Sequence, residues 1–314
     1  MFYKQAKNCP ICKNHITNST NYINKNFPTL GIDRILFCDN CGFGWVANPP
    51  RQKDLKEFYS KEYRKESSPY FIDFKNQQRA LHMSSRSLAQ LLLARNFFLK
   101  DDVNFFLDVG PGIGLSFEIA RSLLKARKLI AIEFGKKAKR FYKKIYNAST
   151  IENISTLKET ADIILSSHSL EHFEFYTALE FIFKMKKKMN KNSLFIIEVP
   201  HVDLRIHKKI RGQDDPHMMF FSKKSLKNFL ELNNLHLLFI DTCGEKYDDN
   251  KLTNYENNKN FNNYIRILIN YFPFLKKIIS TFLGEFLRSR INLDDTNFCY
   301  SGNRVNLRAV AKLK

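Results

Sequence analysis

The chain has 314 residues, a formal net charge of +20, 44% hydrophobic residues and 29 phenylalanines. This length allows one large domain with a small appendage, and the hydrophobic content is that of a globular protein. The basic charge would suit a polyanion or an anionic membrane surface, but lysine and asparagine are abundant throughout, which indicates compositional bias rather than one basic site.

The N-terminus is polar, and no uncharged apolar run is long enough to span a membrane. We therefore expect no signal peptide and no transmembrane segment. The sequence predicts a cytoplasmic protein.

Two Cys-x-x-Cys pairs, Cys9/Cys12 and Cys38/Cys41, lie in the first 50 residues. Two pairs at this spacing are typical of a tetrahedral zinc ribbon, in which each pair offers two thiolates from one tight turn. Because this segment is small, it buries little apolar surface. Zinc would therefore supply much of its folding free energy, on the order of 10 kcal/mol. Disulfide pairing is the alternative, which a reducing compartment disfavours. We predict a zinc-ribbon segment at 1–60.

Two helices are expected after the second cysteine pair, a short capped one at 54–59 and a longer one at 76–99. The longer helix carries a mainly apolar stripe that includes Leu88, Leu92 and Leu99. The other members of the stripe are Leu81, Leu91 and Arg95. This stripe predicts packing against a sheet and a contribution to the wall of a ligand pocket.

The segment 104–114 joins a buried strand to a glycine-rich turn, with Asp108 where the glycines begin. Such a turn lets a ligand lie against backbone N–H groups at the start of the following helix. The segment 128–133 reads as a second buried strand, and Glu133 at its end is placed to accept hydrogen bonds from ribose hydroxyls. The glycines of the turn are Gly110, Gly112 and Gly114.

This order of strand, acid-led glycine turn, helix, strand and acid resembles the class I S-adenosylmethionine-dependent methyltransferases, whose turn reads Asp-x-Gly-x-Gly-x-Gly. Asp108 matches the acid that begins the turn. The resemblance implies a doubly wound, Rossmann-like α/β fold with a seven-stranded mixed sheet, and S-adenosylmethionine as cofactor. It also implies that Gly112→Val abolishes binding of the cofactor.

The same family pattern places polar residues near the adenine, just after a third strand at 149–151. Glu152 and Asn153 are the candidates, and Ser167 at the end of the fourth strand is a further cofactor-binding candidate.

The segment 161–173 joins the fourth strand to the phrase Ser-His-Ser-Leu-Glu-His and resembles a motif of small-molecule methyltransferases. His168, Glu171 and His172 would share one face if the turn were helical. In one hypothesis a histidine is the general base for the acceptor. In another the three residues bind a divalent ion, as the Glu-x-x-Glu-His phrase does in ubiquinone-pathway O-methyltransferases and plant small-RNA ribose methyltransferases. His168 replaces the first glutamate, which disfavours magnesium. A structural role is the third alternative.

Two features resemble bacterial methyltransferases of sugar and surface-polysaccharide pathways: the segment 42–50 after the second cysteine pair, and His217 before aromatic residues and a helix capped by Ser222. His217 is therefore a further acid/base or substrate-binding candidate. The resemblance implies methyl transfer to an oxygen or nitrogen of a saccharide or nucleotide-linked intermediate of capsule or envelope polysaccharide synthesis.

The segments 235–243 and 305–313 are expected to be the sixth and seventh strands, with a helical cap inserted between them. Apolar residues at 264–290 predict that the cap forms a lid, a homodimer contact or a membrane-surface contact. The predicted methyltransferase domain is thus 61–243 with 305–314, and the cap is 244–304.

Three other functions fit parts of the pattern. An RNA or DNA methyltransferase would dock the polymer on the zinc ribbon and the basic surface, with steeply salt-dependent binding. A sugar C-methyltransferase shares the front half of the pattern. A non-enzymatic module would keep the cofactor pocket only to bind a partner.

Overall fold

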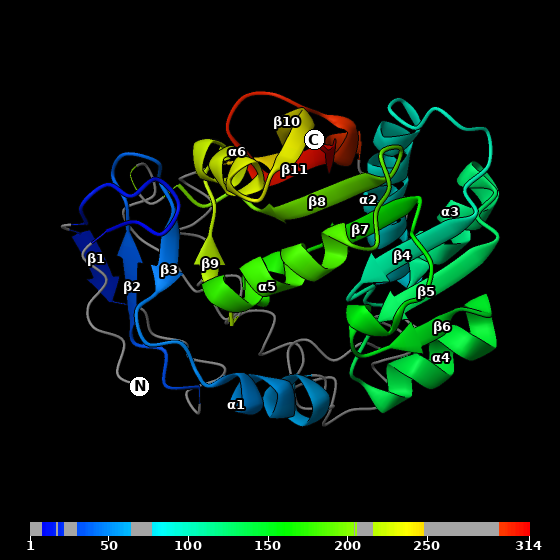
Figure 1. The fold of residues 1–314 in the computed structure, drawn as a ribbon, viewed down its shortest axis with the longest axis horizontal. Coiled ribbons are helices and arrows are strands. Elements are labelled where there is room, and N and C mark those ends of the chain that lie inside the picture. The colour runs from blue at the N-terminus through cyan, green and yellow to red at the C-terminus, as the bar shows by residue number, and fades with distance from the viewer. Residues whose placement is uncertain are drawn as a thin grey trace, which may run out of the picture.

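Two β-sheets organise the protein in the computed structural model (Figure 1). The structure describes residues 8–16, 18–21, 30–63, 77–203, 205, 216–247 and 295–314. Most of the expected cap, including the 264–290 contact segment, therefore lies outside the described residues. Among the residues that are described, no helix is both long and apolar enough to cross a membrane.

The large sheet has seven strands and confirms the doubly wound α/β fold. All neighbours pair in parallel except β11, which pairs antiparallel with both β8 and β10. In spatial order the strands are β10 (Leu235–Lys246), β11 (Arg304–Leu313), β8 (Leu194–Pro200), β7 (Ile163–Ser167), β4 (Phe105–Val109), β5 (Lys128–Ile132) and β6 (Ser149–Ile151).

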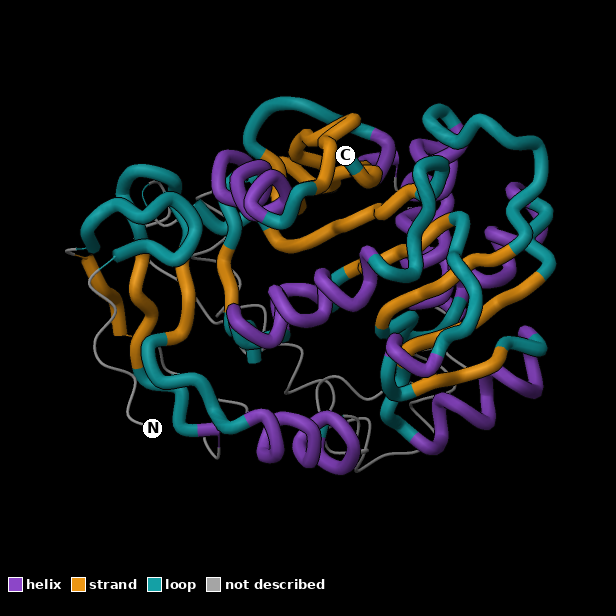
Figure 2. Tube along the Cα trace, viewed as in Figure 1, coloured by secondary structure: helices purple, strands orange, loops and turns teal. Residues whose placement is uncertain are grey.

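Helices alternate with the parallel strands and cover both faces of this sheet (Figure 2). Phe106 of β4 packs in the core under α2, α3 and α4, whereas its neighbours Phe105 and Leu107 face the core under α5 and α6. This alternation follows from the two-residue period of a strand that is buried on both faces. The helices are α2 (Gln77–Arg95), α3 (Leu115–Leu124), α4 (Lys136–Tyr146), α5 (Phe175–Lys186) and α6 (Lys223–Leu232).

The expected stripe on the long helix is wrong in part. Leu88 and Leu92 are exposed, and Leu99 lies beyond the end of α2 at Arg95 with 91% of its surface exposed. Leu91, which also belongs to the expected stripe, is buried as predicted, and it packs with Ala94 against α3 and the sheet.

The short N-terminal helix differs from the expectation at both ends. α1 (Gln52–Glu57) has no side-chain cap and continues directly into a π-helix, Phe58–Glu62. π-Helical turns are rare and occur often at functional sites. Here the turn carries Tyr59, which contacts a histidine described below.

The small sheet joins the cysteine-rich segment to the rest of the chain. Its strands are β1 (Asn18–Asn21), β2 (Arg34–Phe37), β3 (Gly44–Val46) and β9 (Met219–Phe220). β9 pairs antiparallel with β3, so that Trp45 lies opposite Met219. Phe43 stacks on Trp45 and also meets Phe175 and Phe221, with ring centroids 5.5, 5.8 and 5.3 Å away. The cysteine-rich segment therefore shares one core with the large sheet.

A fully buried ion pair crosses the large sheet between β11 and β8. Arg308 Nε donates to Glu198 Oε2 at 2.6 Å, and both side chains are inaccessible to solvent. Gln90 Nε2 of α2 donates to the same oxygen at 2.9 Å. This ion pair holds β11 and β8 together beside the carboxyl end of β7.

We expect Arg308→Met to lower the free energy of unfolding by about 3–5 kcal/mol at neutral pH, because it leaves Glu198 as a buried charge without its closest partner. Burial alone would raise the pKa of Glu198, but the Arg308 charge and the contact with His168 hold it well below its usual range. A lowered carboxyl pKa stabilises the folded state above the unfolded pKa, and this stabilisation is lost as pH falls. The deficit of the variant should therefore shrink below about pH 4.3, the unfolded value.

Urea unfolding at several pH values measures this difference. Arg127→Met is the matched control, because Arg127 Nη2 pairs with Asp102 at 3.2 Å on the surface. We expect it to cost less than about 1 kcal/mol. An equally small cost for Arg308→Met would show that the buried pair is not a major source of stability.

Candidate active site

The glycine-rich turn runs from the end of β4 into α3. Gly110, Gly112 and Gly114 all have positive φ angles, of 68°, 64° and 76°. Residues with a Cβ rarely adopt this left-handed conformation. At Gly110 a Cβ would also lie only 2.6 Å from Ser169 Oγ. Both the backbone and its surroundings therefore require glycine at this position.

Asp108, at the end of β4, is a carboxylate with an unused acceptor. The side chain is 1% exposed, and Ser116 Oγ donates to its Oδ2. Its other oxygen, Oδ1, has no hydrogen-bond partner in the described part of the chain. Burial raises the pKa of Asp108 to about 7, against the opposite effect of the Ser116 hydrogen bond. A buried acceptor without a partner is costly, so this position suits a ligand that brings a donor or a positive charge.

Glu133 follows β5 and lies next to the same turn. Its Oε1 accepts hydrogen bonds from the backbone N–H groups of Phe134 and Gly135, both at 2.8 Å. The Tyr142 hydroxyl lies 2.6 Å from the Gly112 carbonyl oxygen and 3.3 Å from Glu133 Oε2. Tyr142 thus connects the glycine turn to the acid that the sequence places at the ribose.

The other three cofactor candidates already have protein partners. Glu152 is exposed and forms ion pairs with Lys139 at 2.7 Å and Lys56 at 3.4 Å. Asn153 Oδ1 accepts from the backbone of Ser155 and caps a 3-10 turn. Ser167 Oγ accepts a hydrogen bond from Gln90 Nε2 at 2.8 Å. The same nitrogen also donates to Glu198. Their role in cofactor binding stays a prediction.

The segment after β7 lies against the glycine turn. Ser169 Oγ donates to the Val109 carbonyl oxygen at 2.6 Å, next to Gly110. His168 has a positive φ of 51° and precedes the 3-10 helix Leu170–His172. His168, Glu171 and His172 therefore do not share one helical face as expected. The 3-10 turn is tighter than an α-helix, and it begins only after His168.

The His168 ring lies between two buried carboxylates. Its Nδ1 is 3.5 Å from Glu171 Oε1, and its Nε2 is 3.4 Å from Glu198 Oε1. Burial and the Arg86 charge lower the pKa of His168, but the two carboxylates outweigh them and raise it overall. The side chain is 26% exposed, which makes it reachable from outside the core.

Glu171, His172 and His217 form a group of possible ligands, and His168 adjoins this group through Glu171. The potential ligand atoms of these three residues all lie within 4.8 Å of one another. The Met218 N–H donates to the Glu171 carbonyl oxygen at 2.8 Å, which holds the start of β9 against the 3-10 helix. Burial lowers the pKa of His217 to about 3. For Glu171, burial raises the pKa, but the neighbouring histidines outweigh it and lower it overall.

Sequence reasoning missed two tyrosines of this cluster. The Tyr59 hydroxyl lies 3.0 Å from His172 Nδ1. Tyr59 and Tyr63 both meet the His172 ring edge-on, with centroids 5.7 and 6.1 Å away. Their four-residue spacing places them on one helical face, and this is the one signal that the sequence offers. Nothing in the sequence connects them to a histidine more than one hundred positions later.

The family of the chain follows from a comparison with family models. A model described as "Methyltransferase domain" matches residues 76–238, which is 163 of the 314 residues. The chain belongs to this methyltransferase family. The prediction of an S-adenosylmethionine-dependent methyltransferase is thereby confirmed.

Several solved methyltransferase structures are similar to the chain at low identity. An S-adenosylmethionine-dependent methyltransferase from Archaeoglobus fulgidus is 18% identical, over 72% of this chain and 94% of that one, with a TM-score of 0.44. Magnesium protoporphyrin IX methyltransferase from Synechocystis, with bound S-adenosylhomocysteine, is 11% identical, over 84% and 100%, with a TM-score of 0.46. No curated protein matches the chain. These likenesses are too weak to carry an acceptor over to this methyltransferase.

The cysteine pairs of the methyltransferase form one compact cluster. The four Sγ atoms lie within 4.8 Å of one another, with 3.7 Å between Cys9 and Cys41 and 3.5 Å between Cys12 and Cys38. A tetrahedral zinc ion with Zn–S bonds of about 2.3 Å holds its sulfurs about 3.8 Å apart. The donor set and its spacing therefore fit zinc.

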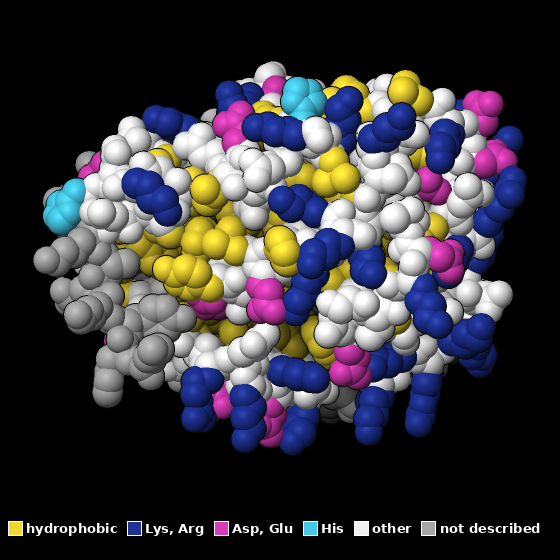
Figure 3. Space-filling view, in the orientation of Figure 1, with side chains coloured by type: hydrophobic (Ala, Val, Ile, Leu, Met, Phe, Trp, Pro, Cys, Tyr) yellow, Lys and Arg dark blue, Asp and Glu magenta, His cyan; other side chains and the backbone are white. Residues whose placement is uncertain are grey.

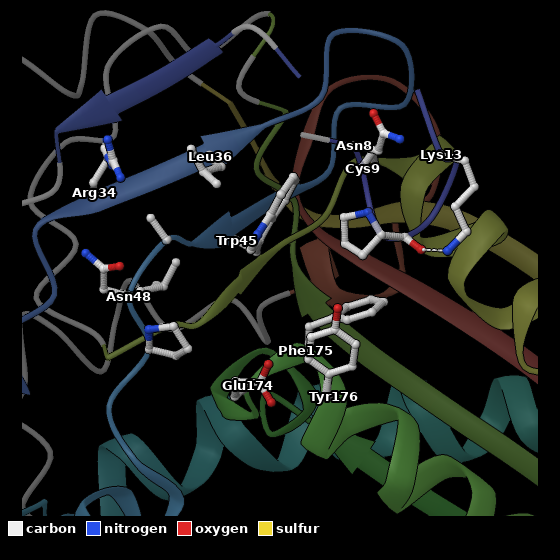
Figure 4. A pocket seen from close by; sticks show the side chains of 14 residues that line it. Asn8, Cys9, Lys13, Arg34, Leu36, Trp45, Asn48, Glu174, Phe175 and Tyr176 are labelled. Carbon is white, nitrogen blue, oxygen red and sulfur yellow. Dashed lines mark hydrogen bonds between the residues drawn. The ribbon is translucent and has the colours of Figure 1, made fainter. Parts of the chain in front are cut away.

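A cavity of about 220 Å³ lies beside this cluster, between the small sheet and the start of α5 (Figure 4). Trp45, Phe175 and Tyr176 form its apolar walls, and Lys13 and Arg34 lie at its margin. No residue of the glycine turn or the histidine cluster lines it, so it is separate from the candidate active site.

Proposed function

We propose that this methyltransferase transfers a methyl group to an oxygen or nitrogen atom of a saccharide or nucleotide-linked acceptor in the synthesis of an envelope polysaccharide. One contact carries the proposal: Ser169 Oγ donates to the Val109 carbonyl oxygen at 2.6 Å. This bond places the histidine phrase directly beside the acid-led glycine turn. Donor and acceptor sites would then meet at the carboxyl ends of β4 and β7, where open parallel sheets bind ligands.

The donor side would consist of the glycine turn and its two acids. The turn and the start of α3 offer backbone N–H groups, and Glu133 would accept hydrogen bonds from the ribose hydroxyls. Asp108 Oδ1, which is buried without a hydrogen-bond partner among the described residues, supports a polar or cationic ligand there. When bound, S-adenosylmethionine supplies a methyl group on a positively charged sulfur.

The acceptor side would consist of the histidines and Tyr59. In the transfer, the acceptor atom forms a bond to the methyl carbon while the carbon–sulfur bond breaks, and the acceptor proton leaves. We assign to His168 the uptake of that proton, because its side chain is partly exposed and the two carboxylates beside it would stabilise the protonated ring. The sulfonium is a good leaving group, so positioning would provide about 7–11 kcal/mol, and a base would add only about 10²–10⁴ in rate.

We expect His168→Gln to lower kcat by about 10²–10⁴-fold and to leave the affinity for S-adenosylmethionine unchanged. Methyl transfer from labelled S-adenosylmethionine to a panel of saccharides and nucleotide sugars measures kcat, and calorimetry measures donor affinity. His236→Gln, on the exposed side of β10, is the control. An unchanged kcat for His168→Gln would exclude it as the base. A panel with no methylated member would refute the acceptor class.

The basic surface gives the nucleic-acid alternative little support. Figure 3 shows Lys and Arg side chains along the edge formed by α1 and α4. Acids interleave with them: Lys61 pairs with Glu57 at 2.8 Å, and Glu152 pairs with two further lysines. A small-molecule acceptor requires no extended basic groove, so we expect only weak binding to RNA or DNA.

The four clustered cysteines would hold one structural zinc ion. The sulfurs are unbonded to one another and are spaced for a metal rather than for disulfides, which supports a reducing, cytoplasmic location.

A further inference from the structure

We propose that Glu171, His172 and His217 bind one divalent transition-metal cation, which positions the acceptor through adjacent oxygen atoms. The inference rests on the proposed methyl transfer and assigns a second metal site in addition to the proposed zinc site. It also divides the roles of the histidines, since it makes two of them ligands and leaves His168 to take up the proton.

The Glu171 carboxylate is the observation that points to a ligand. Its side chain is 1% exposed, and neither Oε1 nor Oε2 has a hydrogen-bond partner in the described part of the chain. The nearest ring nitrogens to Oε1 are His168 Nδ1 at 3.5 Å and His217 Nε2 at 3.9 Å, both too far for a good hydrogen bond. A buried carboxylate without donors is costly, and a bound cation would satisfy it.

The three side chains converge as metal ligands do. Their ligand atoms lie within 4.8 Å of one another, and Glu171 and His217 are buried. An ion about 2.1 Å from each ligand atom would bring these atoms to within about 3–4 Å of one another, which requires only small movements. Tyr59 at His172 Nδ1 and the backbone bond from Met218 to Glu171 hold the ligands in place. Such support is usual around metal sites.

The chemistry of the donor set selects the ion. Two imidazoles and one carboxylate favour first-row transition metals, whereas magnesium prefers oxygen ligands. His168 is not part of the set: its Nδ1 lies 3.5 Å from Glu171 and its Nε2 faces Glu198, but it does not lie within the 4.8 Å group that Glu171, His172 and His217 form. Three protein ligands leave open positions on the ion. Those positions suit an acceptor with two adjacent oxygen atoms, such as the vicinal hydroxyls of a saccharide.

Titration of the zinc-loaded, full-length protein with Co²⁺ tests the site, with absorption spectra and metal analysis as readouts. We expect one equivalent of Co²⁺ in addition to zinc, with d–d bands but without the charge-transfer bands of thiolate ligands. Glu171→Gln and His217→Gln should each weaken Co²⁺ binding by at least about 10–100-fold. His168→Gln and the surface control His236→Gln should bind Co²⁺ like the wild type.

Wild-type protein that takes up no second equivalent would overturn the proposal, whether or not the variants fold. Co²⁺ binding that survives in both Glu171→Gln and His217→Gln would overturn it as well. A protein that binds Co²⁺ but methylates no saccharide would keep the metal site and refute the acceptor class. A protein that methylates saccharides but binds no Co²⁺ would refute the metal site alone.

Discussion

Cys41→Ala should remove the proposed zinc ion and cost the folded protein on the order of 10 kcal/mol. This loss is as large as the whole stability of a typical domain, about 5–15 kcal/mol, so we expect the small sheet to unfold. Cys41 is completely buried, and its carbonyl oxygen accepts a hydrogen bond from Ser222 Oγ at 2.5 Å. Unfolding should therefore extend to β9 and to His217 just before it.

Metal analysis and thermal unfolding of the variant measure this effect. Cys299→Ser is the matched control, because Cys299 lies outside the cysteine cluster. We expect the control to retain one zinc ion and the wild-type melting temperature. A Cys41→Ala protein with the wild-type melting temperature, or a wild type that purifies without zinc, would contradict the structural role of the metal.

Gly110→Val should abolish binding of S-adenosylmethionine. The backbone at Gly110 has a φ of 68°, which costs a residue with a Cβ about 1–3 kcal/mol, and more if it is β-branched. In addition, the Cβ would lie 2.6 Å from Ser169 Oγ and displace the bond from Ser169 to Val109. We expect the affinity measured by calorimetry to fall more than about 100-fold, since 1.4 kcal/mol corresponds to a factor of ten.

Gly302→Val separates backbone strain from the local overlap. Gly302 has a similar φ of 77°, but an added Cβ would have no heavy atom of the described residues within 4 Å. This control should lose some stability and keep its affinity for the donor. Donor binding by Gly110→Val as tight as that of the wild type would refute the proposed role of the turn.

The elements that could be predicted from the sequence have strong local signals. The helix expected after Ser222 is α6 (Lys223–Leu232), and Ser222 caps its first turn through the backbone of Ser225 as predicted. β4 and β7 read as apolar runs because both faces of the sheet are covered. Asp108 and Glu133 could be placed near one turn because the ends of adjacent parallel strands meet at one edge.

Contacts between distant segments could not be predicted. β9 has two residues, and its hydrogen-bonding partner is a strand of the cysteine-rich segment, so no periodicity reveals it. The same pairing brings His217 to within 3.9 Å of Glu171, whose carboxylate also lies 3.5 Å from the expected partner His168. Tyr59 reaches His172 through a π-helical turn that no local propensity specifies.

The pairing of β3 with β9 also has a consequence for the order of folding. Trp45 lies opposite Met219, so these paired residues are separated by 174 positions in the chain (219 − 45). The cysteine-rich segment is synthesised early, yet the edge of β3 stays open until the ribosome has passed residue 219. Nascent chains should therefore expose this edge for most of translation, and chaperones or early zinc capture would protect it from pairing with other chains.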